Sequence, residues 1–130
     1  MTRVAAAVIR KDGKILIARR EKGQAHEGLW EFPGGKIEES ETPQACLERE
    51  IEEELGLLVR AGPVVAQSED HSRHGSFVIL AMEAEIVGGK EVLTVHDRTA
   101  WVSPADLKRY SLAPADRELA HRIASLEGGK

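Results

Sequence analysis

The chain has 130 residues, a single cysteine, a net charge of −4, and 42% hydrophobic and 31% charged residues. That balance excludes a disordered chain and fits one domain over residues 1–130, while the lone cysteine excludes an intrachain disulfide. The acidic balance and the short apolar N-terminal run indicate a cytoplasmic protein that binds neither a nucleic acid polymer nor a membrane. We expect a monomer or a homodimer.

The first part of the chain is predicted to form strands. Asp12-Gly13 is a strong hairpin signal, because the favoured two-residue turn needs positive φ at both positions. Pro33-Gly34-Gly35 is expected to break the strand pattern that precedes it. The expected elements are strands over residues 4–9, 15–18 and 29–32, with a polar loop over residues 21–28.

The next segment is the best-defined helix of the sequence. Thr42 suits the N-cap, and Pro43 suits the first helical position, where a missing N–H costs no hydrogen bond. Gly56 stands where a left-handed residue would end the helix. The buried stripe is expected to consist of apolar residues spaced by four, namely Leu47, Ile51 and Leu55.

Strands return after Gly62-Pro63, and a last helix closes the chain. Residues 72–76 are expected to connect two of these strands, and Ser103-Pro104 to start a brief helix. The expected elements are strands over residues 64–66, 77–81 (extending towards 86) and 99–102, and a helix from residue 114 to about residue 126. Because strands flank a central helix, the fold class is mixed α/β.

Three glutamates share one stripe of the central helix. Glu50, Glu53 and Glu54 are spaced i, i+3, i+4 and lie beside the apolar stripe, where a cleft wall would be. A glutamate-rich face is by itself usually a solvated surface. At about 6 Å and an effective dielectric of about 20, however, each pair repels by roughly 3 kcal/mol, so a half-buried cluster needs a counter-charge. Mg²⁺ supplies one and keeps substrate phosphates among its oxygen ligands.

The spacing around the stripe is more specific than the stripe itself. Gly35 is followed after five residues by Glu41, and after seven more by the run from Arg49 to Leu57. With average residue usage, a random window matches these fixed and aliphatic positions about once in 10⁹. Residues 35–57 resemble the Nudix box, and the chain resembles a Nudix hydrolase over nearly its full length.

The resemblance implies an α/β/α sandwich around a mixed sheet, and hydrolysis of a nucleoside diphosphate linked to another group with Mg²⁺ or Mn²⁺. Arg49 would orient the glutamates by ion pairing, with Glu41 as its partner. The motif leaves open which glutamate accepts the proton from the attacking water; we assign Glu53, with Arg49 and Glu50 as the other catalytic residues. The implied metal ligands are a backbone carbonyl of Gly34-Gly35 and the carboxylates of Glu50, Glu53 and Glu54.

Within the family, the chain is similar to the small MutT-like nucleoside triphosphate pyrophosphohydrolases. Residues 15–20, 30–36 and 112–116 carry this likeness. It implies phosphate contacts from Arg20 and His26, although either side chain also fits a plain surface charge. The implied substrate-binding residues are Arg20, His26, Glu31, Phe32 and Asp116.

Asp116 has two explanations. An acid in the first turn after Pro114 complements the helix dipole. A carboxylate also accepts hydrogen bonds, so it suits an exocyclic amine such as cytosine N4, or equally guanine N1 and N2. The string from Ala113 to Asp116 resembles the cytidine triphosphate pyrophosphohydrolase branch, whereas the 8-oxoguanine-cleaning branch often has Asn at the last position.

One position departs from the family pattern. Many relatives carry a Glu, often Glu-His, in the loop before the strand containing Trp101, where this chain has Val95-His96. Asp97 and Glu91 are the candidate substitutes for that acid. Without either, the general base of that loop is missing and Glu53 must serve.

The expected function is Mg²⁺-dependent hydrolysis of a (d)NTP to NMP and pyrophosphate, which would sanitise oxidised or modified nucleotides of the 8-oxo-dGTP type. The alternatives are a cytidine-type pyrophosphohydrolase acting on CTP or modified dCTP, another family substrate such as a dinucleoside polyphosphate or nucleotide sugar, and a non-catalytic nucleotide sensor.

Overall fold

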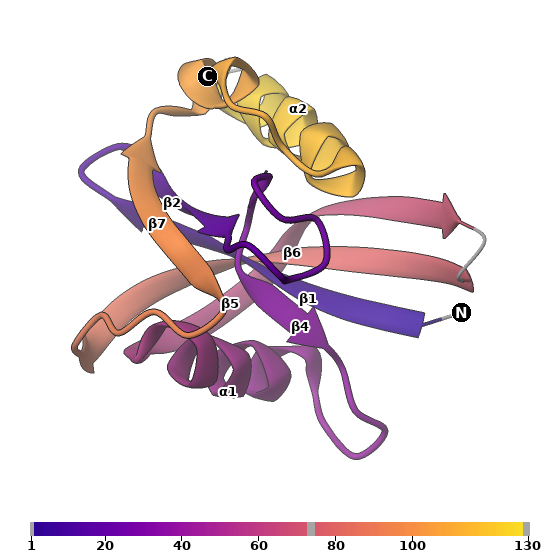
Figure 1. Cartoon of the computed structure of the whole chain (residues 1–130), viewed down its shortest axis with the longest axis vertical. Helices are drawn as coiled ribbons and strands as arrows, with labels where there is room; N and C mark the ends of the chain where they lie inside the picture. The colour runs from indigo at the N-terminus through magenta and orange to yellow at the C-terminus, as the bar shows by residue number, and fades with distance from the viewer. Residues whose placement is uncertain (1, 73–74, 129–130) are drawn as a thin grey trace.

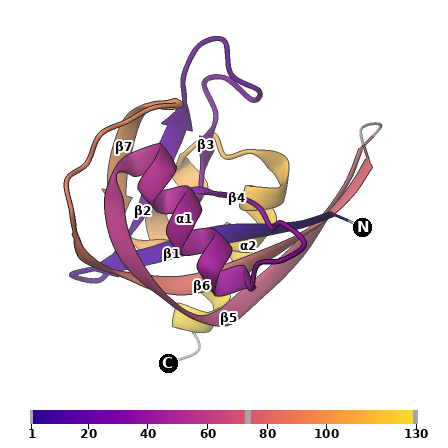
Figure 2. The same ribbon diagram turned by 90° about the horizontal axis from the view of Figure 1, so that it is seen from below.

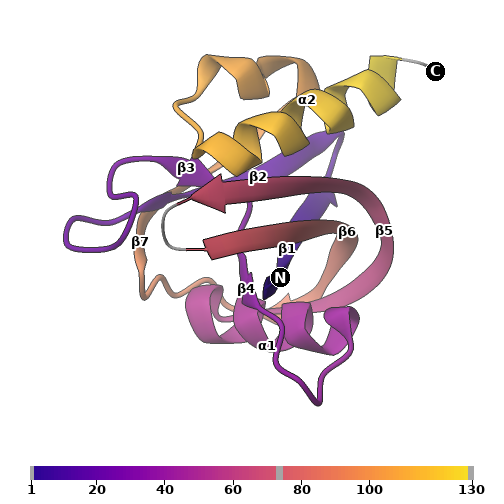
Figure 3. The ribbon, with the colours of Figure 1, turned by 90° about the vertical axis from the view of Figure 1, so that its right-hand side faces the viewer.

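A computed structural model describes residues 2–72 and 75–128. A β-sheet lies between two helices: α1 (Pro43–Leu55) covers one face and α2 (Pro114–Gly128) covers the other (Figure 1, Figure 3). This layering, around a sheet with parallel and antiparallel pairs, confirms the mixed α/β sandwich expected from the sequence. Neither helix in the described part of the chain is long and apolar enough to pass through a lipid bilayer.

The sheet is built around β1 (Thr2–Lys11). This strand is antiparallel to β2 (Lys14–Arg20) through the predicted hairpin, antiparallel to β4 (Gly34–Lys36), and parallel to β6 (Gly75–Gly89). The remaining elements are β3 (Trp30–Glu31) and β7 (His96–Val102), which pair with β2, β5 (Leu57–Ser72), which pairs with β6, and the 3₁₀ helix η1 (Pro104–Arg109).

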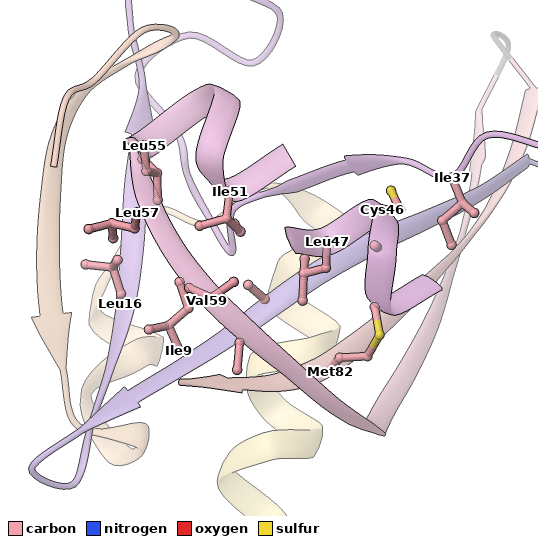
Figure 4. Close-up of a cluster of buried hydrophobic side chains, with 13 residues drawn as sticks. Ile9, Leu16, Ile37, Cys46, Leu47, Ile51, Leu55, Leu57, Val59 and Met82 are labelled. Atoms are coloured by element: carbon pink, nitrogen blue, oxygen red, sulfur yellow. The ribbon is translucent and has the colours of Figure 1, made fainter. Parts of the chain in front are cut away.

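The central strand β1 is buried on both faces. Ala5, Ala7 and Ile9 pack towards α1, whereas Ala6 and Val8 pack towards α2. Successive side chains of a strand point to opposite faces, so a strand covered on both sides requires the unbroken apolar run seen in the sequence. Figure 4 shows the core on the α1 side, where β1 meets the helix residues Leu47, Ile51 and Leu55.

Helix α1 begins and ends as its sequence predicts. The Thr42 side chain accepts a hydrogen bond from the Ala45 N–H at 3.1 Å, and Pro43 opens the helix. Gly56 follows the helix in the left-handed conformation with φ 72°, and its N–H donates to the Glu52 carbonyl. Figure 2 shows the result, with α1 lying across β1, β5 and β6.

Two short predictions were wrong because strand pairing is not local. Pro33-Gly34-Gly35 was expected to break the strand pattern, but Gly34 and Gly35 begin β4, whose residues lie opposite Val4, Ala5 and Ala6 of β1. The strand expected to begin at residue 99 begins at His96, because β7 stays paired with β2 as far as Arg20.

The strand β5 is also longer than predicted, since it starts directly after α1 rather than after Gly62-Pro63. Among the described residues it pairs with β6 alone, at the sheet edge, and its register shifts between Ala61 and Val64. A proline lacks the N–H needed inside a ladder, so an edge strand with an irregularity is where Pro63 is tolerated. Of the predicted connection at residues 72–76, residues 73–74 lie outside the described residues.

Replacing Thr42 with alanine removes the oxygen that accepts from the Ala45 N–H. Loss of such an N-cap costs about 1 kcal/mol, so we expect the free energy of unfolding to fall by about that amount in Thr42→Ala. Equilibrium urea denaturation measures this, with the exposed Ser40→Ala as the matched control. Equal free energies for the two variants would contradict a stabilising cap.

Candidate active site

Glu50, Glu53 and Glu54 of α1 stand at the edge of its buried face but differ in exposure. The side chains of Glu50 and Glu54 retain 17% and 15% of their accessible surface, whereas Glu53 retains 59%. Two carboxylates therefore form part of a wall beside the core, and the third reaches solvent from the same stripe.

A glycine allows Glu50 to lie against the backbone of β4. Pairing with β1 sets Gly35 opposite Ala5. A Cβ at Gly35 would collide with the carboxylate of Glu50, so any other residue would force that side chain away. The Gly35-to-Glu50 spacing read in the sequence thus has a steric reason, because the backbone and carboxylate approach each other closely.

Arg49 is the cation that holds these acids together. Its Nε donates to Glu41 at 2.6 Å, and its Nη1 donates to Glu50 at 3.0 Å and to Glu53 at 3.3 Å. The hydrogen bond from Arg49 lowers the pKa of Glu41 to about 2. Burial raises the pKa of Glu50, and Arg49 opposes that rise. The Arg49–Glu41 ion pair expected from the sequence is present.

Glu54 faces a different cation. Its Oε2 lies 3.9 Å from Nη1 of Arg20 on β2. Its Oε1 is buried and has no hydrogen-bond partner among the residues that the structure describes. Burial is the main cause that raises the pKa of Glu54 to about 7. A buried carboxylate oxygen of this kind is a place where a cation or an ordered water fits.

Arg20 on β2 and Glu31 on β3 lie beside Glu54, and these two residues form a second wall of the candidate site. Nη1 of Arg20 donates to Glu31 at 3.5 Å, and the same guanidinium bonds to Gln24 and to the carbonyl of Ala25 in the following loop. The structure therefore brings two of the sequence-predicted substrate residues beside the acids of α1.

His96 also belongs to this wall, although the sequence did not mark it as a site residue. Its Nε2 lies 2.8 Å from Oε2 of Glu31, and its side chain is fully buried. The only sequence signal was its place beside Val95 in the Glu-His position of the family pattern. Neither its burial nor its contact with Glu31 could be read from local spacing.

Asp116 and Phe32 are joined on the α2 side of the sheet. Oδ1 of Asp116 accepts a hydrogen bond from the Phe32 N–H at 3.0 Å, and the Phe32 ring is part of the α2-side core. Burial raises the pKa of Asp116 to about 7, against the opposing effect of that hydrogen bond. Because Glu31 and Phe32 are consecutive, one peptide links Asp116 to the wall that contains Arg20.

In the part of the chain that the structure describes, no hydrogen bond or ion pair joins the side chains of His26 or Val95 to these groups. His26 is exposed in the loop after β2 and has a left-handed backbone, φ 58°. Val95 is half-buried, and its two candidate substitutes are engaged elsewhere: Asp97 accepts from Arg19 Nε at 2.8 Å, and Glu91 accepts from a threonine of β7.

The oxygen donors suit a hard divalent cation in kind. Glu50, Glu53 and Glu54 offer carboxylates, and the buried oxygen of Glu54 has no protein partner among the described residues. Within that part of the chain, no three acidic, histidine or cysteine side chains already surround one point. Arg49 bonds Glu50 and Glu53, whereas Glu54 faces Arg20.

Known proteins share this sequence and fold. The NUDIX domain profile matches residues 1–123. The CTP pyrophosphohydrolase of Escherichia coli strain K12 is 38% identical over 133 residues, covering 100% of this chain and 96% of that protein. The Putative 8-oxo-dGTP diphosphatase 2 of Mycobacterium tuberculosis is 36% identical over 115 residues, covering 88% of this chain and 81% of that protein. The solution structure of the E. coli ORF135 protein superposes with a TM-score of 0.87 at 34% identity, covering 100% of this chain and 93% of that one.

The chain therefore belongs to the Nudix hydrolase family, among its MutT-like members. It is a nucleotide pyrophosphohydrolase, and enzymes of this family typically depend on a divalent metal. The expected family and enzyme class are confirmed.

Burial of Glu54 should make the stability of the metal-free protein depend on pH. Folding raises its pKa from the ordinary 4.5 to about 7, so the folded protein keeps a proton that the unfolded chain releases. This stabilisation is complete below the unfolded pKa and is lost as the pH rises through about 7. We expect Glu54→Gln to flatten that fall in the free energy of unfolding.

Urea denaturation in EDTA at about pH 5 and about pH 8 measures the effect. The exposed Glu52→Gln is the control on the same helix and should keep the wild-type pH dependence. Parallel profiles for wild type and Glu54→Gln would show that Glu54 does not titrate as described.

Proposed function

We propose that residues 1–130 form one hydrolase domain that cleaves nucleoside triphosphates to nucleoside monophosphate and pyrophosphate with Mg²⁺ or Mn²⁺. The observation that carries the proposal is the opposition of Glu54 on α1 and Arg20 on β2, 3.9 Å apart. One wall of the site is rich in carboxylates, which suit divalent cations, and the other offers a guanidinium, which suits phosphate oxygens. A polyphosphate that binds cations can contact the carboxylates through those cations and the guanidinium through its phosphate oxygens.

In this proposal the carboxylates of Glu50, Glu53 and Glu54 and a backbone carbonyl of Gly34-Gly35 hold the cation. When bound, the cation polarises the phosphoryl oxygens and lowers the pKa of a water that attacks phosphorus. Arg49 keeps two of the glutamates aligned through its hydrogen bonds. Arg20 holds the phosphates from the other wall, and His26 is a second phosphate contact from the exposed loop.

We assign the proton-accepting role to Glu53. It is the most exposed of the three glutamates, so a water can reach it from solvent. Glu54 is more deeply buried, which leaves it less accessible to a water from solvent. Val95 supplies no acid from the loop, and Asp97 is bonded to Arg19.

The test is product identity. Purified protein with Mg²⁺ or Mn²⁺ should release pyrophosphate and a monophosphate from at least one (d)NTP, and EDTA should stop the release. Glu53→Gln should lower kcat by at least about 100-fold, as expected for loss of a general base, while an α,β-methylene triphosphate analogue still binds. Glu52→Gln, exposed on the same helix, should keep wild-type kcat.

Each alternative gives a different result. A nucleotide sugar or dinucleoside polyphosphate hydrolase would yield two nucleotide or sugar phosphates, as when ADP-ribose gives AMP, rather than pyrophosphate. A sensor would bind the analogue but turn over no nucleotide, and Glu53→Gln would change nothing. Failure to release product from any canonical or modified (d)NTP would overturn the proposal.

The preferred base is the finer part of the proposal. The carboxylate of Asp116, held by the Phe32 N–H, can accept from the exocyclic amine of cytosine. The 38% identical relative is named for CTP and the 36% identical relative for 8-oxo-dGTP. We place cytosine nucleotides first and oxidised guanine nucleotides second, which reverses the order expected from the sequence.

Asp116→Asn tests this assignment. An amide oxygen can still accept from the Phe32 N–H, so the fold should be retained. The amide nitrogen, however, donates a hydrogen bond, so asparagine no longer favours a base that presents only an amine donor. We expect the ratio of kcat/KM for dCTP over 8-oxo-dGTP to fall by about tenfold or more. The surface variant Asp106→Asn is the control. An unchanged ratio in Asp116→Asn would remove this residue from base selection.

A further inference from the structure

His96 is a buried histidine that the proposed reaction does not use. It is the first residue of β7, and its side chain has no exposed surface. Its Nδ1 is buried and has no hydrogen-bond partner among the described residues. An apolar side chain would fill this space without leaving a polar atom unpaired, so packing alone does not explain a histidine here.

An extra residue in β7 turns His96 towards α1. Arg98 pairs with Arg19 of β2, on the face that α2 covers. The next pair is Arg20 with His96, so Asp97 has no opposite residue and forms a bulge. Strict alternation would put His96 on the same face as Arg98, and the extra residue moves it to the other face. That is the face on which Arg20 reaches α1.

His96 contacts the site through Glu31. Its Nε2 lies 2.8 Å from Glu31 Oε2, and the same oxygen accepts from Arg20 Nη1 at 3.5 Å. Arg20 in turn lies 3.9 Å from Glu54. In the tautomer that donates from Nε2, the ring holds Glu31 from inside the protein, and Glu31 holds Arg20. The three side chains come from different strands, β7, β3 and β2, so their approach to one another depends on strand pairing.

We propose that His96 is a positioning residue for nucleotide binding, which anchors Glu31 so that Glu31 keeps Arg20 aimed at the substrate phosphates; this inference rests on the proposed function. Without His96, Glu31 loses its buried partner and no longer holds Arg20 firmly, so the guanidinium keeps only its bonds to Gln24 and the Ala25 carbonyl. Glu50 and Glu53 are aligned by Arg49 instead. Loss of His96 therefore weakens binding and leaves the chemical step nearly unchanged.

The test compares two substitutions. His96→Leu keeps apolar bulk but removes the donor, whereas the amide of His96→Gln can still donate to Glu31. In His96→Leu, we expect KM for the preferred triphosphate and Kd for its α,β-methylene analogue each to rise about tenfold, the effect of losing one charge-assisted hydrogen bond. We expect kcat to stay within about threefold of wild type. His96→Gln should recover most of the binding.

A double-mutant cycle with Glu31→Gln separates positioning from general damage. If both residues act through one contact, His96→Leu combined with Glu31→Gln should bind no worse than Glu31→Gln alone. His121→Gln, on the exposed side of α2, is the matched histidine control. Thermal melting confirms folding, and His96→Asn, which is too short to reach Glu31, replaces His96→Leu if the latter does not fold.

The outcomes distinguish this inference from the function on which it rests. Unchanged KM and Kd in the folded variant, additive losses in the cycle, or a fall in kcat at unchanged KM would each overturn the positioning role and leave the proposed hydrolysis intact. A wild-type protein that neither binds nor cleaves any nucleoside triphosphate would overturn both.

Discussion

Carboxylates crowded beside the buried face of α1 impose the constraint on which the rest of the site depends. Burial disfavours charge on Glu50 and Glu54, and each is close to other acids, so positive charge must reach them from fixed positions. Arg49 supplies it to Glu50 from the same helix, and Arg20 approaches Glu54 from β2. Arg20 compensates the negative charge of Glu54 only in part, and the pKa of Glu54 rises to about 7. In the proposed function a divalent cation supplies the remaining positive charge. The burial of Glu54, which lowers the stability of the free protein at neutral pH, then also creates affinity for metal.

The sheet makes this crowding possible by fixing both sides of the site. Because β1 is covered on both faces, α1 cannot shift without opening the core that contains Ile9 and Ile51. The pairing of β4 with β1 sets Gly35 under Glu50, and the absence of a side chain there leaves room for the carboxylate. Apolar packing thus holds the mutually repelling carboxylates in place, because the burial of apolar surface stabilises the fold independently of the charges.

A single short strand connects the two halves of the substrate site. Consecutive residues of an extended chain point to opposite faces, so Glu31 faces Arg20 and α1 while Phe32 faces the α2-side core. The Phe32 N–H fixes Asp116 at the start of α2. In the proposed function, the parts of the site that bind phosphates and base are therefore held at a distance set by one peptide rather than by flexible loops.

The sequence by itself determined the local features and the chemistry they carry. The Thr42 cap, the four-residue periodicity and the Gly56 end depend on neighbours within one or two helical turns, and the box spacing places the glutamates on one stripe of that helix. Only the tertiary structure decided the pairing of β4 with β1 and the bulge that turns His96 towards Glu31. These depend on partners far away in the chain, and one extra residue reverses the face of a strand, so spacing alone could not show them.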